Sequence, residues 1–119
     1  MTGRQKILVV NEKDEVIGEK YRRDMDYDQD IFRSSVLWLT NSSGEVLLAK
    51  RVMTKKKDPG KWGPSVAGTL EVGETYDSNM VKEIQEEIGL GGVKLIAGSK
   101  IFEDVPRKHF IQWYTASVD

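Results

Sequence analysis

The sequence predicts a single α/β (α+β) layer domain, in which at least one helix packs against a mixed sheet. The length of 119 residues suits one domain, and 39% hydrophobic residues are enough to fill one core. Short apolar segments separated by polar or glycine-containing turns predict several strands. One stretch, residues 76–88, instead has helical periodicity. No repeat or linker divides the chain, so we expect residues 1–119 to form one domain.

The predicted strands are short and are separated by clear turn signals. The turn sequence NSSG between residues 32–40 and 45–51 predicts a β-hairpin. Residues 22–30 are polar without a period, and residues 52–64 are rich in lysine and contain a Pro-Gly turn, so both predict loops. The predicted strands are residues 6–10, 16–21, 32–40, 45–51, 65–68, 93–103 and 109–118.

The helix predicted over Tyr76–Ile88 has recognisable ends. Thr75 is a suitable N-cap, and Asp77 lies in the first turn, where the helix dipole favours negative charge. Gly89 can adopt the left-handed conformation that ends a helix. The residues expected to form its apolar face are Met80, Val81, Ile84 and Ile88.

Composition excludes several classes of function. The 18 basic and 19 acidic residues nearly balance, which argues against nucleic-acid or membrane binding by bulk charge. No cysteine is present, so disulfides and thiolate chemistry are excluded. With a single histidine, a metal site would rest on oxygen ligands, which suit magnesium, calcium or manganese. The first apolar run is too short for a signal peptide or a membrane span, so we expect a cytoplasmic protein.

Three glutamates, Glu83, Glu86 and Glu87, share a second face of the predicted helix. Such a face is usually solvated, and the repulsion between its carboxylates costs a few tenths of a kcal/mol per pair. Alternatively, the carboxylates converge on a divalent cation, which cancels their repulsion. The surrounding pattern G-x5-E-x7-(R/K)-E-x-x-E-E-x-G favours the second interpretation. Its positions are Gly68, Glu74, Lys82, Glu83, Glu86, Glu87 and Gly89.

This pattern over residues 68–90 resembles the Nudix box, and the chain resembles Nudix-family proteins. The resemblance implies an α/β/α sandwich around a mixed sheet, with the box forming a loop-helix-loop. It implies a Mg2+ cofactor, with Mn2+ as an alternative, and hydrolysis of a diphosphate linked to another moiety, such as a nucleoside diphosphate derivative. The small-molecule diphosphate would be the partner of the site. The implied metal ligands are Glu83, Glu86, Glu87 and the main-chain carbonyl of Ala67.

The resemblance also implies roles in catalysis. Glu83 would orient or deprotonate the attacking water, and Glu74 would support the loop and the helix. Lys82 stands where the family usually has arginine, and it keeps the charge but loses the two-pronged guanidinium. Its position four residues before Glu86 would allow it to neutralise part of the cluster. The substitution leaves open an alternative function, a weakly active or silent module that binds a diphosphate or nucleotide.

Upstream, the segment AKRVMTKKKDPGKWGPSVAG is similar to isopentenyl-diphosphate isomerases, also of the Nudix fold, and this likeness covers roughly residues 8–90. Those isomerases depend on a cysteine and on histidines, where this chain has Ala67 and Thr69. Isomerase activity is therefore disfavoured, and the isomerase-like hydrolase branch remains. The likeness implies that Arg51 and Lys55 contact substrate phosphates. For Lys55 a solvated loop is an equal alternative.

Other polar and aromatic residues favour structural interpretations. Trp62 is expected to pack under a loop, with stacking on a base as the alternative, and His109 to be structural or at the surface rather than catalytic. Glu103 and Asp104 are expected to form a turn, with an additional carboxylate near the metal as the alternative.

Nudix domains usually continue past the last strand predicted here with another strand and a helix that covers the second sheet face. If that face is apolar and uncovered, we expect the chain to form a homodimer.

Overall fold

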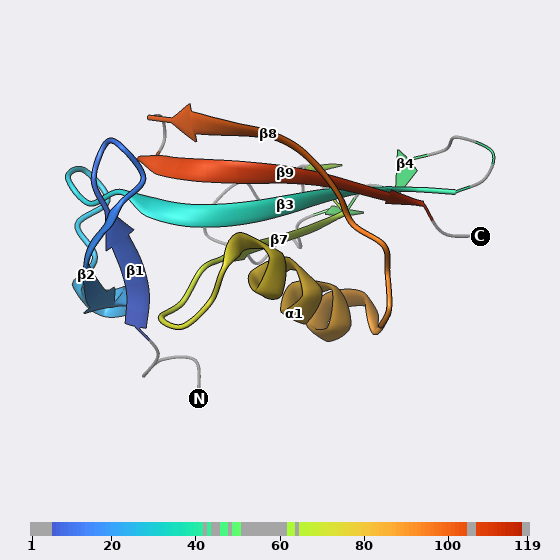
Figure 1. Cartoon of the computed structure of the whole chain (residues 1–119), viewed down its shortest axis with the longest axis horizontal. Coiled ribbons are helices and arrows are strands. Elements are labelled where there is room, and N and C mark those ends of the chain that lie inside the picture. Colours follow the sequence, from blue (N-terminus) through green and yellow to red (C-terminus); the bar gives the residue numbers. More distant parts are fainter. Residues whose placement is uncertain are drawn as a thin grey trace.

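The computed structural model describes residues 6–41, 43, 46–47, 49–50, 62–63, 65–104 and 107–117. One α-helix in this part of the chain lies across a face of a mixed sheet, as predicted (Figure 1). The strands are β1 (Lys6–Val10), β2 (Val16–Tyr21), β3 (Phe32–Thr40), β4 (Val46–Leu47), β5 (Ala49–Lys50), β6 (Trp62–Gly63), β7 (Val66–Thr69), β8 (Ile96–Glu103) and β9 (His109–Ser117). The helices are α1 (Tyr76–Ile88) and a 3-10 turn at Arg22–Asp24, inside a predicted loop.

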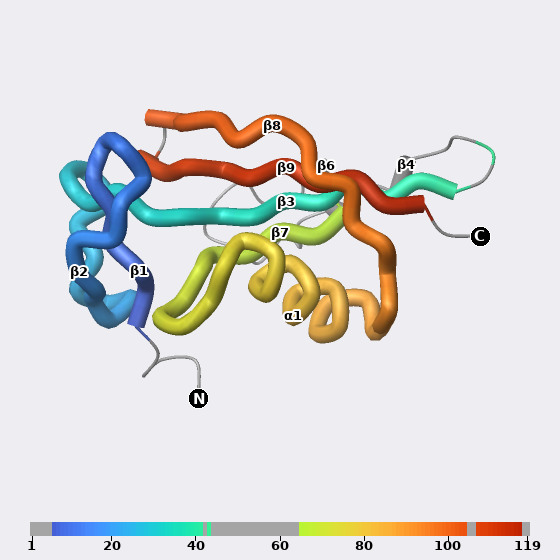
Figure 2. The backbone as a smooth tube through the Cα atoms, viewed as in Figure 1, coloured from blue at the N-terminus to red at the C-terminus, as the bar shows by residue number. Residues whose placement is uncertain are grey.

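The central sheet has five strands and is built around β3. Strand β3 pairs in parallel with β9 and antiparallel with β4 and β7, and β8 forms the outer edge beyond β9. The tube in Figure 2 shows β8, β9, β3 and β7 running side by side above the helix. The single parallel pair makes the sheet mixed, as predicted, because the long connection through α1 returns the chain in the same direction.

The predicted hairpin after β3 is only partly correct. Strand β4 does pair with the end of β3, with Leu39 opposite Leu47. The predicted strand 45–51 is divided, however, because β5 leaves this sheet and pairs with β6 instead. The predicted strand 93–103 begins only at Ile96, since Val93 and Leu95 pack against the core where the chain crosses from α1 to the sheet edge.

Helix α1 begins and ends where the sequence predicts. The Thr75 hydroxyl accepts a hydrogen bond from the Ser78 N–H at 3.0 Å, and the Ser78 hydroxyl accepts one from the Thr75 N–H at 2.9 Å. This capping box satisfies two backbone donors at the helix start. Gly89 ends the helix with φ at 70°. The prediction for Val81 was wrong: its side chain is 55% exposed, because the buried face follows residues four apart.

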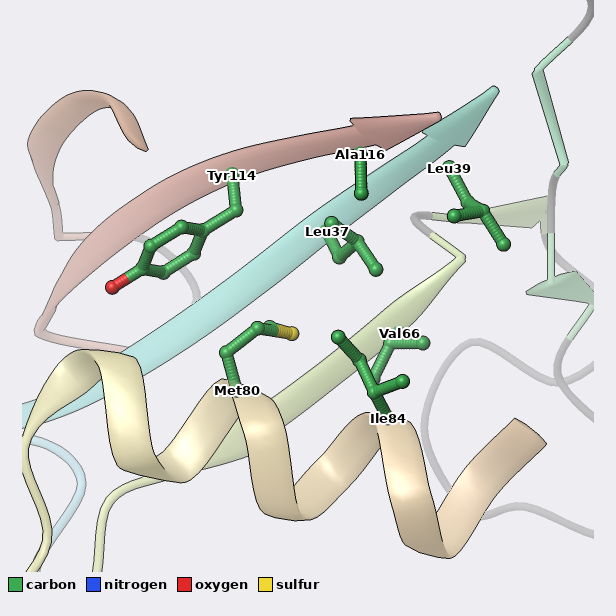
Figure 3. Close-up of a cluster of buried hydrophobic side chains, with 7 residues drawn as sticks. All are labelled: Leu37, Leu39, Val66, Met80, Ile84, Tyr114 and Ala116. Atoms are coloured by element: carbon green, nitrogen blue, oxygen red, sulfur yellow. The ribbon is translucent and has the colours of Figure 1, made fainter. Parts of the chain in front are cut away.

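The core lies between α1 and one face of the sheet (Figure 3). Met80 and Ile84 point from the helix toward the strands and are almost fully buried. Each buried side chain of this size stabilises the fold by roughly 1.5–3 kcal/mol. The cluster consists of Leu37, Leu39, Val66, Met80, Ile84, Tyr114 and Ala116.

The opposite face of the sheet carries aromatic side chains. Trp38 on β3 and Trp113 on β9 stack with ring centroids 5.6 Å apart and planes 2° from parallel. Among the described residues, α1 is the only α-helix, so this part of the chain contains one helical layer of the expected sandwich. The homodimer predicted for an uncovered face stays a prediction. None of the described helices has the length and apolar character needed to cross a membrane.

The turn between β1 and β2 is tied to the rest of the domain by Asp14. Its carboxylate accepts hydrogen bonds from Arg33 Nε at 2.8 Å, Lys100 Nζ at 2.7 Å and the Tyr76 hydroxyl at 3.0 Å. These donors come from β3, β8 and α1. Burial raises the pKa of Asp14, but the three hydrogen bonds outweigh it and hold the pKa below its ordinary value.

We therefore predict that Asp14→Asn destabilises the protein most at neutral pH. Because the folded-state pKa is lowered, ionised Asp14 contributes stability that is fully present above its ordinary value of 3.8 and is lost as the pH falls through the folded value. The substitution should cost about 2 kcal/mol of unfolding free energy at pH 7. Urea unfolding at pH 7 and pH 3 measures this, with exposed Asp28→Asn as control. An equal loss at both pH values would contradict the assignment.

Candidate metal centre

Helix α1 and strand β7 touch through a row of helix residues spaced by one turn. Asn79, Glu83 and Glu87 are four residues apart, so their side chains lie on one helix face. They meet β7 at three successive residues, 69, 68 and 67 in that order. Helix and strand therefore run antiparallel along this contact, and the row directs two carboxylates to the same stretch of strand.

Gly68 makes room for the middle member of the row. A Cβ atom at Gly68 would lie less than 3.0 Å from the Cγ, Cδ and Oε2 atoms of Glu83. Such a contact does not occur between real atoms, so only glycine allows Glu83 to lie across the strand here. The requirement comes from close approach rather than from backbone conformation, since φ at Gly68 is not positive.

Ala67 presents its backbone polar groups to the helix rather than to β3. The Leu70 N–H donates to the Arg33 carbonyl at 2.9 Å, which sets the alternation of the β3–β7 ladder. In this alternation the N–H and C=O of Ala67 point away from β3, toward the free edge of β7. The Ala67 N–H donates to the Glu87 carboxylate. The Ala67 carbonyl lies on the same edge, because both groups of a strand residue point to one side.

Neighbouring carboxylates raise the energy of the ionised forms of Glu83 and Glu87. Burial raises the pKa of Glu83 to about 7, and the charges of Glu87 and Glu86 add to this effect against the opposing charge of Lys82. Glu83 and Glu86 also share a hydrogen bond. Partial burial raises the pKa of Glu87, while the Ala67 N–H lowers it. Burial and the neighbouring carboxylates therefore both disfavour the ionised forms of Glu83 and Glu87.

Lys82 pairs with the loop before the helix instead of with the glutamate cluster. Its Nζ lies 2.7 Å from Glu74 Oε2 and 3.8 Å from Glu71 Oε1. The spacing of four residues predicted a partner in Glu86, but the described ion pairs of Lys82 go to Glu74 and Glu71. The charge of Lys82 thus acts on these two loop carboxylates and also on Glu83, the next residue of the helix.

Glu74 joins the loop, the helix and Lys82 at one carboxylate. Its Oε1 accepts from the Glu71 N–H at 2.8 Å and from Asn79 Nδ2 at 3.1 Å. Burial raises the pKa of Glu74, but these donors and Lys82 outweigh burial and hold the pKa below its ordinary value. Glu74 is therefore ionised at neutral pH and braces the entry to the helix.

Sequence reasoning missed Asn79, whose side chain is fully buried. Its amide donates to the Thr69 carbonyl at 3.2 Å and to Glu74, and its Oδ1 accepts from the Ser35 hydroxyl. The available signal was its position one helical turn before Glu83, on the face of the glutamates.

Several other predicted residues lie outside this cluster. His109 Nδ1 lies 2.8 Å from the Ser34 hydroxyl, and His109 Nε2 lies 3.3 Å from Glu103 Oε1. Asp104 pairs with Lys108 at 3.0 Å. The described contacts of Glu103 and Asp104 thus involve neighbours on β8, β9 and their connection. Arg51, Lys55 and the side chain of Trp62 lie outside the part of the chain that the structure describes.

The described pockets are not lined by the three glutamates of α1. One of about 480 Å³ and another of about 540 Å³ lie beside the β1–β2 turn, and both are lined by Glu12, Gln29 and Ile31. In the described part of the chain, no three acidic or histidine side chains converge closely enough to hold a metal ion as they stand. The Glu87 carboxylate accepts a hydrogen bond from the Ala67 N–H in this arrangement.

The donor set nevertheless fits a hard divalent cation. Glu83, Glu86, Glu87 and the Ala67 carbonyl offer oxygen atoms only, which magnesium and manganese prefer to softer ligands. The space above Gly68 that a Cβ would fill is taken by the Glu83 side chain, which keeps its carboxylate beside the strand edge. A cation would also offset the repulsion between these carboxylates, which contributes to the raised pKa of Glu83.

Curated relatives of the chain include hydrolases and isomerases. An uncharacterized Nudix hydrolase of Pseudomonas aeruginosa is 30% identical over 100 residues, covering 84% of this chain and 59% of that protein. The isopentenyl-diphosphate Delta-isomerase of Enterobacter sp. (strain 638) is 29% identical over 92 residues, covering 76% of this chain and 50% of that enzyme. The chain thus spans about half the length of these curated relatives.

The fold has a close counterpart among solved structures. A crystal structure of a Deinococcus radiodurans protein superimposes with a TM-score of 0.84 at 25% identity, covering 97% of this chain and 73% of that one. The NUDIX domain family matches residues 32–119, which include both the central sheet and the glutamate helix. The chain therefore belongs to the NUDIX domain family.

Proposed function

We propose that this chain is a hydrolase of a diphosphate linked to another moiety, such as a nucleoside diphosphate derivative, and that it depends on a divalent cation. Mg2+ is the proposed cofactor, with Mn2+ as a substitute. The proposal depends above all on one observation, that Glu83 lies across Gly68 while the charges of Glu86 and Glu87 act on it. Glu83, Glu86, Glu87 and the Ala67 carbonyl would hold the cation.

The cation, when bound, would neutralise the diphosphate and make its bound water more acidic. The residues of the chain would position the attacking water and hold the loop before α1. Glu83 would orient the attacking water or accept its proton. Its side chain is confined above Gly68, so the base is held in place. Glu74 and Lys82 would act by position, because their ion pair fixes the loop that leads into α1.

Hydrolysis is proposed in preference to isomerisation. The segment before the box is similar to isomerases, and one relative bears that name. Ala67 and Thr69, however, stand where those isomerases have a cysteine and a histidine. An alanine side chain cannot transfer a proton, and a threonine hydroxyl is a poor replacement for imidazole. Arg51 and Lys55 are proposed to bind the phosphates, since positively charged side chains suit the negative charge of a diphosphate.

The test is release of phosphate or nucleotide from a panel of nucleoside diphosphate derivatives, with Mg2+ and with chelator. We expect turnover only with the cation. Glu86→Gln and Glu87→Gln should each lower kcat/KM by about a hundredfold, because each removes a ligand. Exposed Gln85→Ala on the same helix is the control. Tight binding without cleavage would instead support a silent diphosphate-binding module. The absence of both binding and cleavage would refute both functions.

The charge cluster also predicts a stability effect. The folded-state pKa of Glu83, about 7, exceeds its ordinary value of 4.5, so ionising Glu83 destabilises the metal-free fold as the pH rises between these values. Glu83→Gln should therefore raise the unfolding free energy at pH 8, in chelator, by about 1 kcal/mol after solvent screening. At pH 4.5 the two proteins should be nearly equal. Saturating Mn2+ should strongly stabilise the wild type but not Glu83→Gln. If Glu83→Gln is less stable than the wild type in chelator at pH 8, the predicted destabilisation by ionised Glu83 is contradicted.

Gly68→Ala should displace the Glu83 side chain. We expect about tenfold weaker Mn2+ binding, because the added methyl occupies space that Glu83 fills, and only a small change in unfolding free energy, because the flexible Glu83 side chain can move aside. Calorimetric titration and urea unfolding measure the two effects. Gly18→Ala is the matched control, since nothing lies within 4 Å of a Cβ there. Unchanged Mn2+ affinity in Gly68→Ala would show that the approach of Glu83 to the strand is unimportant.

A further inference from the structure

We propose that Asn79 is a positioning residue of the metal site, which sets the register of α1 on β7 and so brings Glu83 and Glu87 to the edge at Ala67. The inference deepens the proposed function and rests on it. Asn79 is 0% exposed and lies deep in the contact between helix and sheet. It precedes Glu83 by four residues and Glu87 by eight, so all three lie in one row on the helix.

The side chain of Asn79 joins three separate segments. Its Oδ1 accepts a hydrogen bond from the Ser35 hydroxyl on β3. Its Nδ2 donates to the Thr69 carbonyl on β7 at 3.2 Å and to Glu74 Oε1 at 3.1 Å. A neutral amide is suited to this place because it offers an acceptor and two donors together. A carboxylate of the same shape would face Glu74 with like charge, and an apolar side chain would leave buried partners unpaired.

The geometry of the row explains why its first member matters. Four residues advance a helix by about 6 Å, whereas one residue advances a strand by about 3.4 Å. Helix and strand can therefore stay in register only briefly. The short side chain of Asn79 fixes the point of contact at Thr69. The longer side chains of Glu83 and Glu87 then reach residues 68 and 67 from that fixed point.

A purely structural role makes a different prediction from a positioning role. If Asn79 only stabilises the fold, its loss lowers the unfolding free energy but leaves the folded protein with its normal affinity for a cation. If Asn79 positions the glutamates, the folded variant binds the cation more weakly. Residues that orient metal ligands from behind typically change metal affinity by 10–100-fold. Metal affinity of the folded protein therefore separates the two roles without any measurement of activity.

The experiment is calorimetric titration of the chelator-stripped full chain with Mn2+, under conditions where urea unfolding shows each protein to be fully folded. Asn79→Ala should bind Mn2+ about tenfold more weakly than wild type. Ser35→Ala removes the sheet partner of the amide and should weaken binding by a smaller factor of about three. Gln85→Ala removes an amide from the exposed face of the same helix and should bind as wild type.

Wild-type Mn2+ affinity in a folded Asn79→Ala protein, together with a lower urea midpoint, would overturn the inference. If Asn79→Ala does not fold, Ser35→Ala decides, and wild-type affinity in that variant overturns the inference in the same way. Failure of the proposed function is distinguishable, because the wild-type chain itself would then take up no Mn2+, with or without inorganic pyrophosphate present.

Discussion

The close approach of helix α1 to strand β7 is the contact on which the rest of this site depends. Gly68 has no side chain, so Glu83 can lie across the strand, and the amide of Asn79 holds the helix against the Thr69 carbonyl. Both contacts depend on the hydrophobic packing of Met80 and Ile84 against the sheet. One helix of thirteen residues thus packs against the core with one face and carries the carboxylate cluster on the next.

Charge in this region is separated into two groups. Lys82 is paired with Glu74, where it braces the loop, and the three glutamates lie farther along the helix, where the charges of Glu86 and Glu87 act on Glu83. Such an arrangement lowers the stability of the metal-free protein, since ionised Glu83 is disfavoured at neutral pH. Functional sites commonly carry this kind of cost, which a ligand of opposite charge relieves. The rigid surroundings keep the cluster together despite the repulsion.

The remainder of the domain supplies rigidity at the two ends of this helix. At its start, Tyr76 is held by Asp14, which also binds Arg33 on β3 and Lys100 on β8. The β1–β2 turn, the sheet and the helix are therefore linked at one buried carboxylate. At the other end, Gly89 releases the chain in a left-handed conformation toward the sheet edge. The helix is constrained at both ends, which suits a row of ligands that must stay aligned.

The helix, its ends and the shared face of the glutamates could be predicted from the sequence alone, because capping, periodicity and the box pattern are local properties. The sequence also indicated the family and a mixed sheet. The tertiary structure decided the exposure of Val81, the division of the predicted strand 45–51, the pairing of Lys82 with Glu74 and the burial of Asn79. Each of these four features depends on which residues of other segments pack against the side chain or strand concerned. Local sequence patterns do not specify such neighbours, since the packing of the whole domain selects them.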